Sequence, residues 1–162
     1  MKKQQSGSVL LAALGLTLII SIIVVSAVNR AGSQQKMAAS MKDKELSFQA
    51  TESALKDAET FLVDSSEEAL FGLFNDTNGY YGYDGGRDFL SDASWEDPQS
   101  SDKMYNIAES QSYVIEELPE ILETDDSLAI PRTVDSRYYR VTAKSVGGTE
   151  NASTVLQTVY KK

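Results

Sequence analysis

The chain has 162 residues, with 15 Lys and Arg against 24 Asp and Glu, no His and no Cys, which gives a net charge of −9. Without His or Cys it cannot form a Cys/His zinc site, a cysteine nucleophile, a Ser-His-Asp triad or a disulfide. The net charge is negative and no basic stripe offsets it, so we expect no nucleic-acid partner. We also expect no metal or other cofactor.

A long uncharged segment lies near the N-terminus. No charged residue occurs from Ser6 to Asn29, and Val9–Val28 is a run of 20 mostly apolar residues. At 1.5 Å per residue, a helix of this length covers about 30 Å, the thickness of the hydrocarbon core of a bilayer. We therefore expect residues 8–29 to form a transmembrane helix.

The flanking charges predict the orientation of this helix. Lys2 and Lys3 precede it and Arg30 follows it, which favours a cytoplasmic N-terminus and places residues 30–162 outside the cytoplasm. A cleaved secretory signal is the alternative, because Val25–Ala27 resembles a cleavage site. The apolar run is longer than the usual 7 to 15 residues of such signals, so we favour the membrane anchor.

The helix is expected to continue well past the membrane. Neither Gly nor Pro occurs between Gly32 and Gly72, and good helix formers dominate Gln34–Leu62. Apolar residues recur there at spacings of three, four or seven, namely Met37, Met41, Phe48, Leu55, Ala58 and Leu62. This pattern indicates one apolar stripe along the helix. A helix from Val9 to Leu62 would be about 80 Å long.

The globular part, residues 63–162, begins with an acidic region. Between Asp64 and Asp126 there are 17 acidic residues but only two basic ones, and Gly72–Gly86 contains five of the ten glycines. We expect residues 72–110 to form an irregular surface loop that is anchored by tyrosines.

Strand patterns occupy the C-terminal region, residues 111–162. They lie at Ser112–Leu118, Tyr138–Val146 and Thr154–Tyr160, and a Gly-Gly sequence joins the last two. Tyr139, Val141 and Ala143 alternate onto one face of their strand. The neighbouring strand continues this apolar face either with Val155 and Val159 or with Leu156 and Tyr160. We expect a three-stranded antiparallel sheet that covers the helix around Phe48, Leu55 and Leu62, in a lollipop-shaped α+β fold.

Two acidic clusters could bind or act on a ligand. Asp76–Gly79 and Asp84–Asp88 contain calcium-type ligands, but Tyr80 and Tyr81 stand at positions five and six counted from Asp76, which breaks the EF-hand pattern. We interpret this region as a solvated acidic loop.

A second cluster, Glu116, Glu117 and Glu120, could form the paired carboxylates of a hydrolase. A run of acids beside Pro119 is more typical of a solvated surface, and no pocket is implied. We therefore expect no catalytic residue, and we expect that the chain is not an enzyme.

Residues 1–7, MKKQQSG, form a short basic leader that ends in Gly7 and directly precedes the uncharged helix. This arrangement resembles a class III signal of the type IV pilin superfamily. The resemblance implies that a membrane aspartyl prepilin peptidase cleaves between Gly7 and Ser8 on the cytoplasmic side and that Ser8 becomes N-methylated. Gly has no side chain, so the peptide can extend into a protease cleft beside the bilayer.

A more specific resemblance lies in residues 37–59, MAASMKDKELSFQATESALKDAE. They look like the helix of the PilX family of minor pilins, which carries a similar run around D-x-x-L-A-F-Q-A-A-E. The segments YYRVTAKSVGG and TVLQTVY resemble the closing hairpin of that family, and Asn78–Tyr81 resembles its loop. The resemblance covers the first 62 and the last 50 or so residues well and the middle poorly. It implies a pilin-like fold in which residues 8–62 form one helix and residues 30–62 are its periplasmic part.

One position departs from the general pilin pattern. Most pilins have Glu at the fifth mature position, where its carboxylate is thought to pair with the N-terminal amine of a neighbour, whereas this chain has Ala12. An unpaired carboxylate in a bilayer costs about 3 kcal/mol. We interpret Ala12 as the sign of a subunit at or near the filament tip, with no subunit beyond it.

The resemblance implies a minor pilin of the bacterial inner membrane that primes type IV pilus assembly and then lies at the filament tip. Its implied partners are other minor pilins, the tip adhesin, the major pilin, the inner-membrane platform protein and prepilin peptidase. Met37 and Met41 would contact neighbouring helices in the filament. The alternatives are a membrane-anchored extracytoplasmic enzyme or receptor, and a type II secretion pseudopilin.

Overall fold

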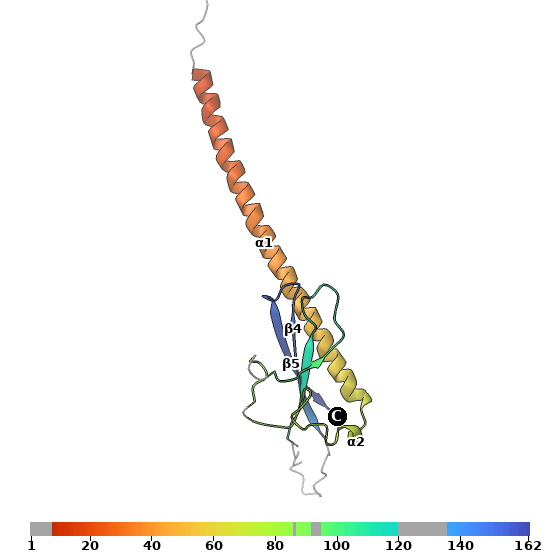
Figure 1. The fold of residues 1–162 in the computed structure, drawn as a ribbon. Helices are drawn as coiled ribbons and strands as arrows, with labels where there is room; N and C mark the ends of the chain where they lie inside the picture. Colours follow the sequence, from red (N-terminus) through yellow and green to blue (C-terminus); the bar gives the residue numbers. More distant parts are fainter. Residues whose placement is uncertain (1–7, 86, 92–94, 120–135) are drawn as a thin grey trace, which may run out of the picture. The chain divides into compact units, whose positions relative to one another are not determined.

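The computed structural model describes residues 8–85, 87–91, 95–119 and 136–162, and these form an α+β structure (Figure 1). Its elements in chain order are α1 (Ser8–Asp64), α2 (Glu67–Leu70), β1 (Tyr80–Tyr81), β2 (Gln99–Ser100), β3 (Ser112–Glu117), β4 (Tyr138–Val146) and β5 (Ser153–Lys161). The chain divides into two compact units, residues 1–41 and residues 42–162. The expected class, a long N-terminal helix with a small sheet, is confirmed.

The helix α1 runs without interruption for 57 residues, close to the expected span of Val9–Leu62. It ends beside Ser66, whose side chain accepts the Ala69 N–H at 3.2 Å and so caps α2. Lys162 Nζ donates to the Leu62 carbonyl at 2.6 Å and also to the Ser65 carbonyl. A cation is favourable there because the C-terminal end of a helix carries partial negative charge.

The sheet has the strand order β1-β3-β4-β5, and β2 also pairs with β3. The expected antiparallel arrangement of β3, β4 and β5 is confirmed. The expectation that residues 72–110 are irregular is corrected, because β1 pairs parallel and β2 antiparallel with β3. The free edge of β3 offers backbone N–H and C=O groups that need partners, and these two short strands supply them.

The register of β4 and β5 decides between the two partner rows considered above. Tyr139 pairs with Tyr160, and Ala143 pairs with Leu156. Leu156 and Tyr160 therefore share the face of Tyr139 and Ala143, which packs on α1. Val159 lies on the opposite face and is 57% exposed.

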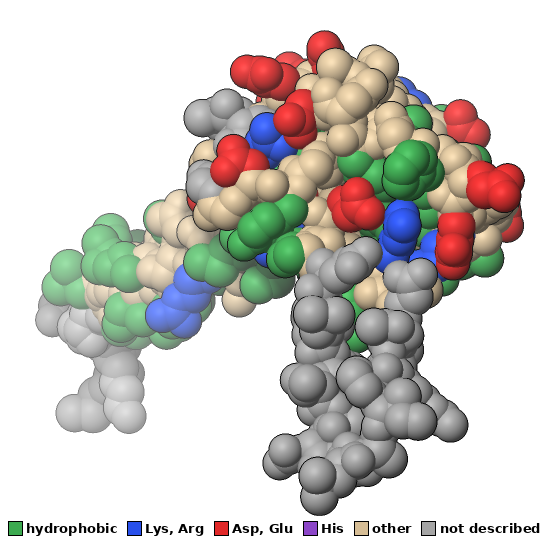
Figure 2. Space-filling view, turned by 90° about the horizontal axis from the view of Figure 1, so that it is seen from below, with side chains coloured by type: hydrophobic (Ala, Val, Ile, Leu, Met, Phe, Trp, Pro, Cys, Tyr) green, Lys and Arg blue, Asp and Glu red, His purple; other side chains and the backbone are tan. Residues whose placement is uncertain are grey.

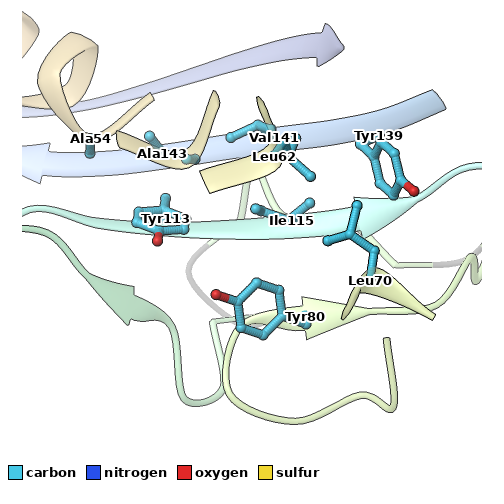
Figure 3. Packing of buried hydrophobic residues seen from close by; sticks show 10 residues of the cluster. Ala54, Leu62, Leu70, Tyr80, Tyr113, Ile115, Tyr139, Val141 and Ala143 are labelled. Atoms are coloured by element: carbon cyan, nitrogen blue, oxygen red, sulfur yellow. The ribbon is translucent and has the colours of Figure 1, made fainter. Parts of the chain in front are cut away.

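The core forms between α1 and this face of the sheet. Ala54, Ala58 and Leu62 are fully buried, and they cluster with residues of β3 and β4 such as Ile115 and Val141 (Figure 3). Burial of a leucine of this kind stabilises a fold by about 1.5–3 kcal/mol. The alanines have little side-chain bulk, so the helix backbone can pack close to the strands.

The expected apolar stripe is correct for Ala58 and Leu62, which are buried, and for Leu55, which packs partly buried against the core. It is wrong for Phe48, which is 47% exposed. Small side chains make up the rest of the buried face, which consists of Ser47, Ala50, Thr51, Ala54 and Ala58 together with Leu62. Phe48 is turned by about 100° from Ser47 around the helix and so misses the sheet.

A polar seam joins α1 to the β4–β5 hairpin. Ser47 Oγ lies 2.6 Å from Thr154 Oγ1 and 3.2 Å from the Ser145 carbonyl oxygen. Thr51 Oγ1 donates to the Ser47 carbonyl at 2.8 Å. Each buried hydroxyl left without a partner would cost about 1–3 kcal/mol, so the seam favours one register of the helix on the sheet.

The other face of β3 is covered by the loop that follows β1. Tyr81, Phe89 and Val114 form a second buried cluster, with Trp95 packed against it. The guanidinium of Arg87 lies 4.7 Å from the centre of the Tyr81 ring. The sheet therefore has a cover on each face at β3.

The β4–β5 turn is held against α1 by Asp43. The Thr149 N–H donates to Asp43 Oδ1 at 3.1 Å, and Thr149 Oγ1 donates to Oδ2. The Thr149 hydroxyl is the main cause of the lowered pKa of Asp43. Gly147 approaches the Asp43 backbone so closely that a Cβ there would overlap the Asp43 carbonyl oxygen.

We predict that Gly147→Ala lowers the midpoint of thermal unfolding. The added methyl group overlaps the Asp43 backbone, and relief of the overlap would separate Thr149 from Asp43. Overpacking of this kind costs about 1–3 kcal/mol, and each kcal/mol lowers the midpoint by about 2–4 °C in a chain of this size. Near-UV circular dichroism of the full chain in detergent measures the change.

Gly82→Ala is the matched control. A Cβ at Gly82 would lie 3.7 Å from the Phe74 carbonyl oxygen, which is an ordinary contact distance. Its midpoint should stay near that of the unmodified chain. Equal midpoints for the two variants would contradict the packing of Asp43 against the turn.

Candidate functional site

The segment Val9–Val28 of α1 is apolar on all sides and exposed. The exposed fractions of its large hydrophobic residues run from 51% at Ile20 to 75% at Val9, and residues 8–29 contain no charge. By length and composition, α1 is able to cross a membrane. A helix that is apolar all round is stable in lipid or among other helices rather than in water. This surface therefore requires a partner.

Two hydroxyl groups within this segment, those of Thr17 and Ser21, bond to the helix itself. Thr17 Oγ1 donates to the Leu14 carbonyl at 2.9 Å, and Ser21 Oγ donates to the Thr17 carbonyl at 2.8 Å. In hydrocarbon each unsatisfied polar group is expensive, so these bonds lower the cost of placing the two residues in lipid. The segment can thus face lipid without exposing these hydroxyl donors.

The predicted processing site lies at the start of α1. Gly7 is outside the described residues, and Ser8 is the first residue of α1. Ala12 is exposed in the first turns of the helix. No Asp or Glu occurs in residues 8–29, so this segment has no carboxylate with which to pair an amine in the membrane. Cleavage before Ser8 and the role of Ala12 stay predictions.

The five predicted helix-packing residues divide into two groups. Leu62 lies in the core of the globular unit, and Leu55 packs partly buried against that core. Met37 and Met41 are 64% and 72% exposed, and Phe48 is also exposed. An exposed methionine is flexible and apolar, which suits contact with another helix. That role of Met37 and Met41 stays a prediction.

The neighbouring carboxylates of β3 do not act as a pair. Glu116 and Glu117 are consecutive in a strand, so their side chains point to opposite faces. Glu116 is fully buried, and its Oε2 lies 3.0 Å from Arg140 Nη1. Glu117 lies 3.7 Å from Arg137, and Glu120 is outside the described residues. Both described carboxylates are thus partners in ion pairs within the sheet.

Burial raises the pKa of Glu116 above its ordinary value. Arg140, the backbone amide of Asp84 and Arg87 act in the opposite direction without cancelling this effect. The raised pKa belongs to a carboxylate held by Arg140 within a strand, so the residue has a structural explanation.

The acidic loop binds its own arginine. Asp76 Oδ1 accepts hydrogen bonds from Arg87 Nη1 at 3.0 Å and from the Gly82 N–H at 3.1 Å. The bond to Arg87 is the main cause of the lowered pKa of Asp76. Within the part of the chain that the structure describes, no three Asp, Glu, His or Cys residues are grouped to hold a metal ion. Asp76 is therefore an ion-pair partner that anchors the loop.

Glu109 and Lys144, together with Trp95, contribute to the lining of a cavity of about 190 Å³. Small-molecule sites usually have volumes of roughly 300–1,000 Å³. Lys144 Nζ lies 5.9 Å from the centre of the Trp95 ring, which accounts for one contact of this lysine. The cavity is therefore smaller than a typical small-molecule site.

The sequence reasoning missed the residues that position α1 on the sheet. These are Ser47 and Thr51 in the polar seam, Asp43 at the turn, and Lys162 at the end of α1. Ser47 and Thr51 could have been found from the stripe of small residues that they share with the alanines. The contacts of Asp43 and Lys162 connect positions about 100 residues apart, and no local pattern reports them.

Two family models match the chain. The model described as PilX N-terminal matches residues 6–56, and the model described as Type IV pilus assembly protein PilX C-term matches residues 49–162. No curated protein and no solved structure matches the chain. The C-terminal match alone covers more than half of the chain.

We predict that Glu116→Gln changes how stability depends on pH. The folded state holds the Glu116 proton more tightly than the unfolded state does, because the folded pKa is raised above 4.5. The free energy of unfolding therefore falls as the pH rises from about 4.5 through the raised pKa, whereas Gln stays neutral. The thermal midpoint of the variant should therefore rise relative to that of the unmodified chain as the pH increases above about 4.5.

Glu117→Gln is the control, because the Glu117 side chain is 36% exposed and pairs with Arg137 at the longer distance of 3.7 Å. The difference between its thermal midpoint and that of the unmodified chain should stay constant with pH. If the thermal midpoint of Glu116→Gln also differed from that of the unmodified chain by a constant amount as the pH changed, the raised pKa would be wrong.

Proposed function

The chain belongs to the PilX family of type IV pilus assembly proteins, and we propose that it is a minor pilin which joins other minor pilins in a tip complex that primes assembly. The observation that carries this proposal is the exposed, uncharged segment Val9–Val28, which continues into the helix that forms the core of the globular unit. The work of such a subunit is binding, without catalysis.

The apolar segment acts first as a membrane anchor and then as an assembly surface. During assembly, Leu10–Val28 leaves lipid and packs among neighbouring helices. Lipid tails are as apolar as leucine, so this step depends on close packing and is helped by small residues. Gly15 suits such packing, because it has no side chain and the space beside it is open. Met37 and Met41 extend the contact surface towards the periplasm.

We infer that the precursor lies in the bacterial inner membrane as a single-pass protein with a periplasmic globular domain. Lys2 and Lys3 on the leader and the charge-free span support this orientation. Prepilin peptidase then removes residues 1–7 and methylates Ser8. Loss of Lys2 and Lys3 leaves 13 basic against 24 acidic residues, so the mature chain is more acidic than the precursor.

Ala12 supports a place at the filament tip. A carboxylate at this position would gain its partner only from the amine of another subunit, and an unpaired one costs about 3 kcal/mol in the bilayer. In a subunit at the tip, with no further subunit beyond it, such a carboxylate would stay unpaired. The adjoining partners are other minor pilins, the tip adhesin, the major pilin and the platform protein.

Two other functions have weaker support. A membrane-anchored enzyme or receptor would need a site, and the carboxylates and the cavity described above do not supply one. A type II secretion pseudopilin of the tip type would need a much larger inserted domain than residues 63–111 provide. The minor pilin therefore remains the proposal.

Deletion of the coding sequence tests the proposal. Surface pili, counted by electron microscopy and measured in the sheared fraction, should fall sharply and return when the full chain is restored. Complementation with Ala12→Glu should restore fewer pili, because a penalty of about 3 kcal/mol corresponds to roughly a 100-fold shift in an equilibrium.

Ala12→Val is the matched control, because it changes the size of the side chain without adding charge. It should restore piliation as the unmodified chain does. Normal piliation in the deletion strain would contradict the priming role. Full restoration by Ala12→Glu, with the minor-pilin complex intact, would count against the tip position alone.

A further inference from the structure

The strand β5 has neighbours on one side only. The strand order ends at β5, and its register with β4 runs without a bulge from Ser153 to Lys161. Just beyond this register, Lys162 and Arg137 exchange two backbone hydrogen bonds. Pairs that exchange bonds alternate with pairs that do not in an antiparallel ladder. The even-numbered residues of β5 therefore bond to β4, and the N–H and C=O groups of the odd-numbered residues point away from it.

This open edge of β5 carries backbone groups without partners among the described residues. They are the N–H and C=O groups of Val155, Gln157, Val159 and Lys161, and no hydrogen bond within the described part of the chain uses them. Natural proteins protect such an edge with a short strand, a proline, a bulge or a charge. β5 has nine residues, no proline and no charge before its last residue. The edge is thus open to another strand.

The helix α1 follows β5 along its whole length. Lys44 donates to the Ser153 carbonyl at the start of the strand, and Lys162 donates to the Leu62 carbonyl just beyond its end. The helix spans about 27 Å between Lys44 and Leu62, and the strand spans about 30 Å between Ser153 and Lys162. Residues 42–64 of α1 and all of β5 belong to the same compact unit.

An apolar side of α1 borders the open edge. Ser153 is odd-numbered, so its carbonyl points away from β4, and the bond from Lys44 places this lysine at the open edge. Residues four and seven positions apart share one side of a helix, so Phe48 and then Leu55 follow Lys44 on this side. Phe48 is 47% exposed and Leu55 is only partly buried. A further strand beside β5 would cover both.

We propose that the open edge of β5 binds an extended segment of another protein as an additional strand of the sheet. Its outward N–H and C=O groups recur every second residue, about 6.8 Å apart, and another extended chain presents matching groups at that spacing. Side chains on one face of the added strand would pack on Phe48 and Leu55. Those on the other face would lie beside Val155 and Val159, which is 57% exposed. The segment is therefore apolar or β-branched along most of its length.

Lysines at both ends of the edge favour acidic ends on the segment. Lys44 lies at the Ser153 end and Lys161 at the other, and neither forms an ion pair with a described residue. β5 itself contains no Asp or Glu. Figure 2 shows Asp and Glu side chains spread over the visible face of the globular unit, so two lysines on one edge are unlike that face. Carboxylates about eight residues apart on the segment would pair with them.

A second copy of this chain fits the edge less well. Two β5 strands paired about Gln157 would place Lys161 of each copy opposite Ser153 of the other. Lys44 already donates to the Ser153 carbonyl, so two lysines would meet at each end of the contact. Like charges directly opposite one another destabilise a strand pair. The partner is therefore a different chain, and the inference does not depend on the priming role.

Amide exchange with a strand-forming peptide tests the proposal. The probe is the acetylated and amidated peptide EVTVTVTVE, added to the full chain in detergent. NMR of the ¹⁵N-valine-labelled chain follows Val155 and Val159, whose amides point outward, and Val141, whose amide points to β5. Saturating peptide should slow exchange at Val155 and Val159 by about tenfold or more and leave Val141 unchanged. The peptide KVTVTVTVK should bind about tenfold more weakly.

Val159→Pro tests the backbone contact. It removes one outward N–H, and proline is tolerated on an edge strand where the N–H does not face the neighbouring strand. A carbonyl of the peptide would lose its donor, so the affinity, measured by fluorescence anisotropy, should fall about tenfold. Val159→Thr is the matched control, because it keeps both the N–H and the branched shape. It should bind the peptide as the unmodified chain does.

Phe48→Ala tests the side-chain contact. Loss of the ring removes apolar area that the added strand would cover, so the affinity should again fall about tenfold. Leu90→Ala is the control, because Leu90 is 59% exposed and lies in the loop on the other face of the sheet. It should leave the affinity unchanged.

Several results would overturn the proposal. These are unchanged exchange at Val155 and Val159, equal affinities of Val159→Pro and Val159→Thr, and equal affinities of the two peptides. Slow exchange at Val155 and Val159 before peptide is added would also overturn it. In a monomer this would show that another part of the same chain covers the edge, and in a dimer seen by light scattering it would show a second copy. The deletion strain tests the priming role separately.

Discussion

One continuous helix must satisfy two different surroundings, and this constraint organises the molecule. In Val9–Val28 the helix is apolar on every side, and two of its hydroxyl groups bond to its own backbone. From Ser47 to Leu62 only one narrow side is buried, and it consists of small residues together with Leu62. Apolar residues surround the first part of the helix but lie on one side of the last part. The same helix can therefore be anchored in lipid at one end and pack against the sheet at the other. The polar seam at Ser47 and Thr154 then sets the helix in one register on the sheet.

The fold was largely predictable because its main elements leave local patterns. The lack of Gly and Pro after Gly32 indicated one long helix, and alternating β-branched and aromatic residues indicated β3, β4 and β5. β1 and β2 were missed because two-residue strands make no pattern and form only to pair the free edge of β3. Phe48 was misplaced because large side chains were taken as the sign of the buried face, whereas the close approach of helix and sheet requires small ones.

The candidate site was predictable only where it depends on composition. The uncharged helix and the lack of a carboxylate at Ala12 can both be recognised from the sequence without knowledge of the tertiary structure. The clamp of Arg87 on Asp76, the pairing of Glu116 with Arg140 and the cap formed by Lys162 connect residues distant in the chain, so sequence patterns could not reveal them.

The central claim is that the apolar N-terminus is a retained assembly element and is neither an export signal nor a plain tether. The intact mass and N-terminal peptide of the chain purified from its native cells test this most directly. The account predicts a product that begins at N-methylated Ser8. A product that begins at Met1, or after Ala27, would contradict it.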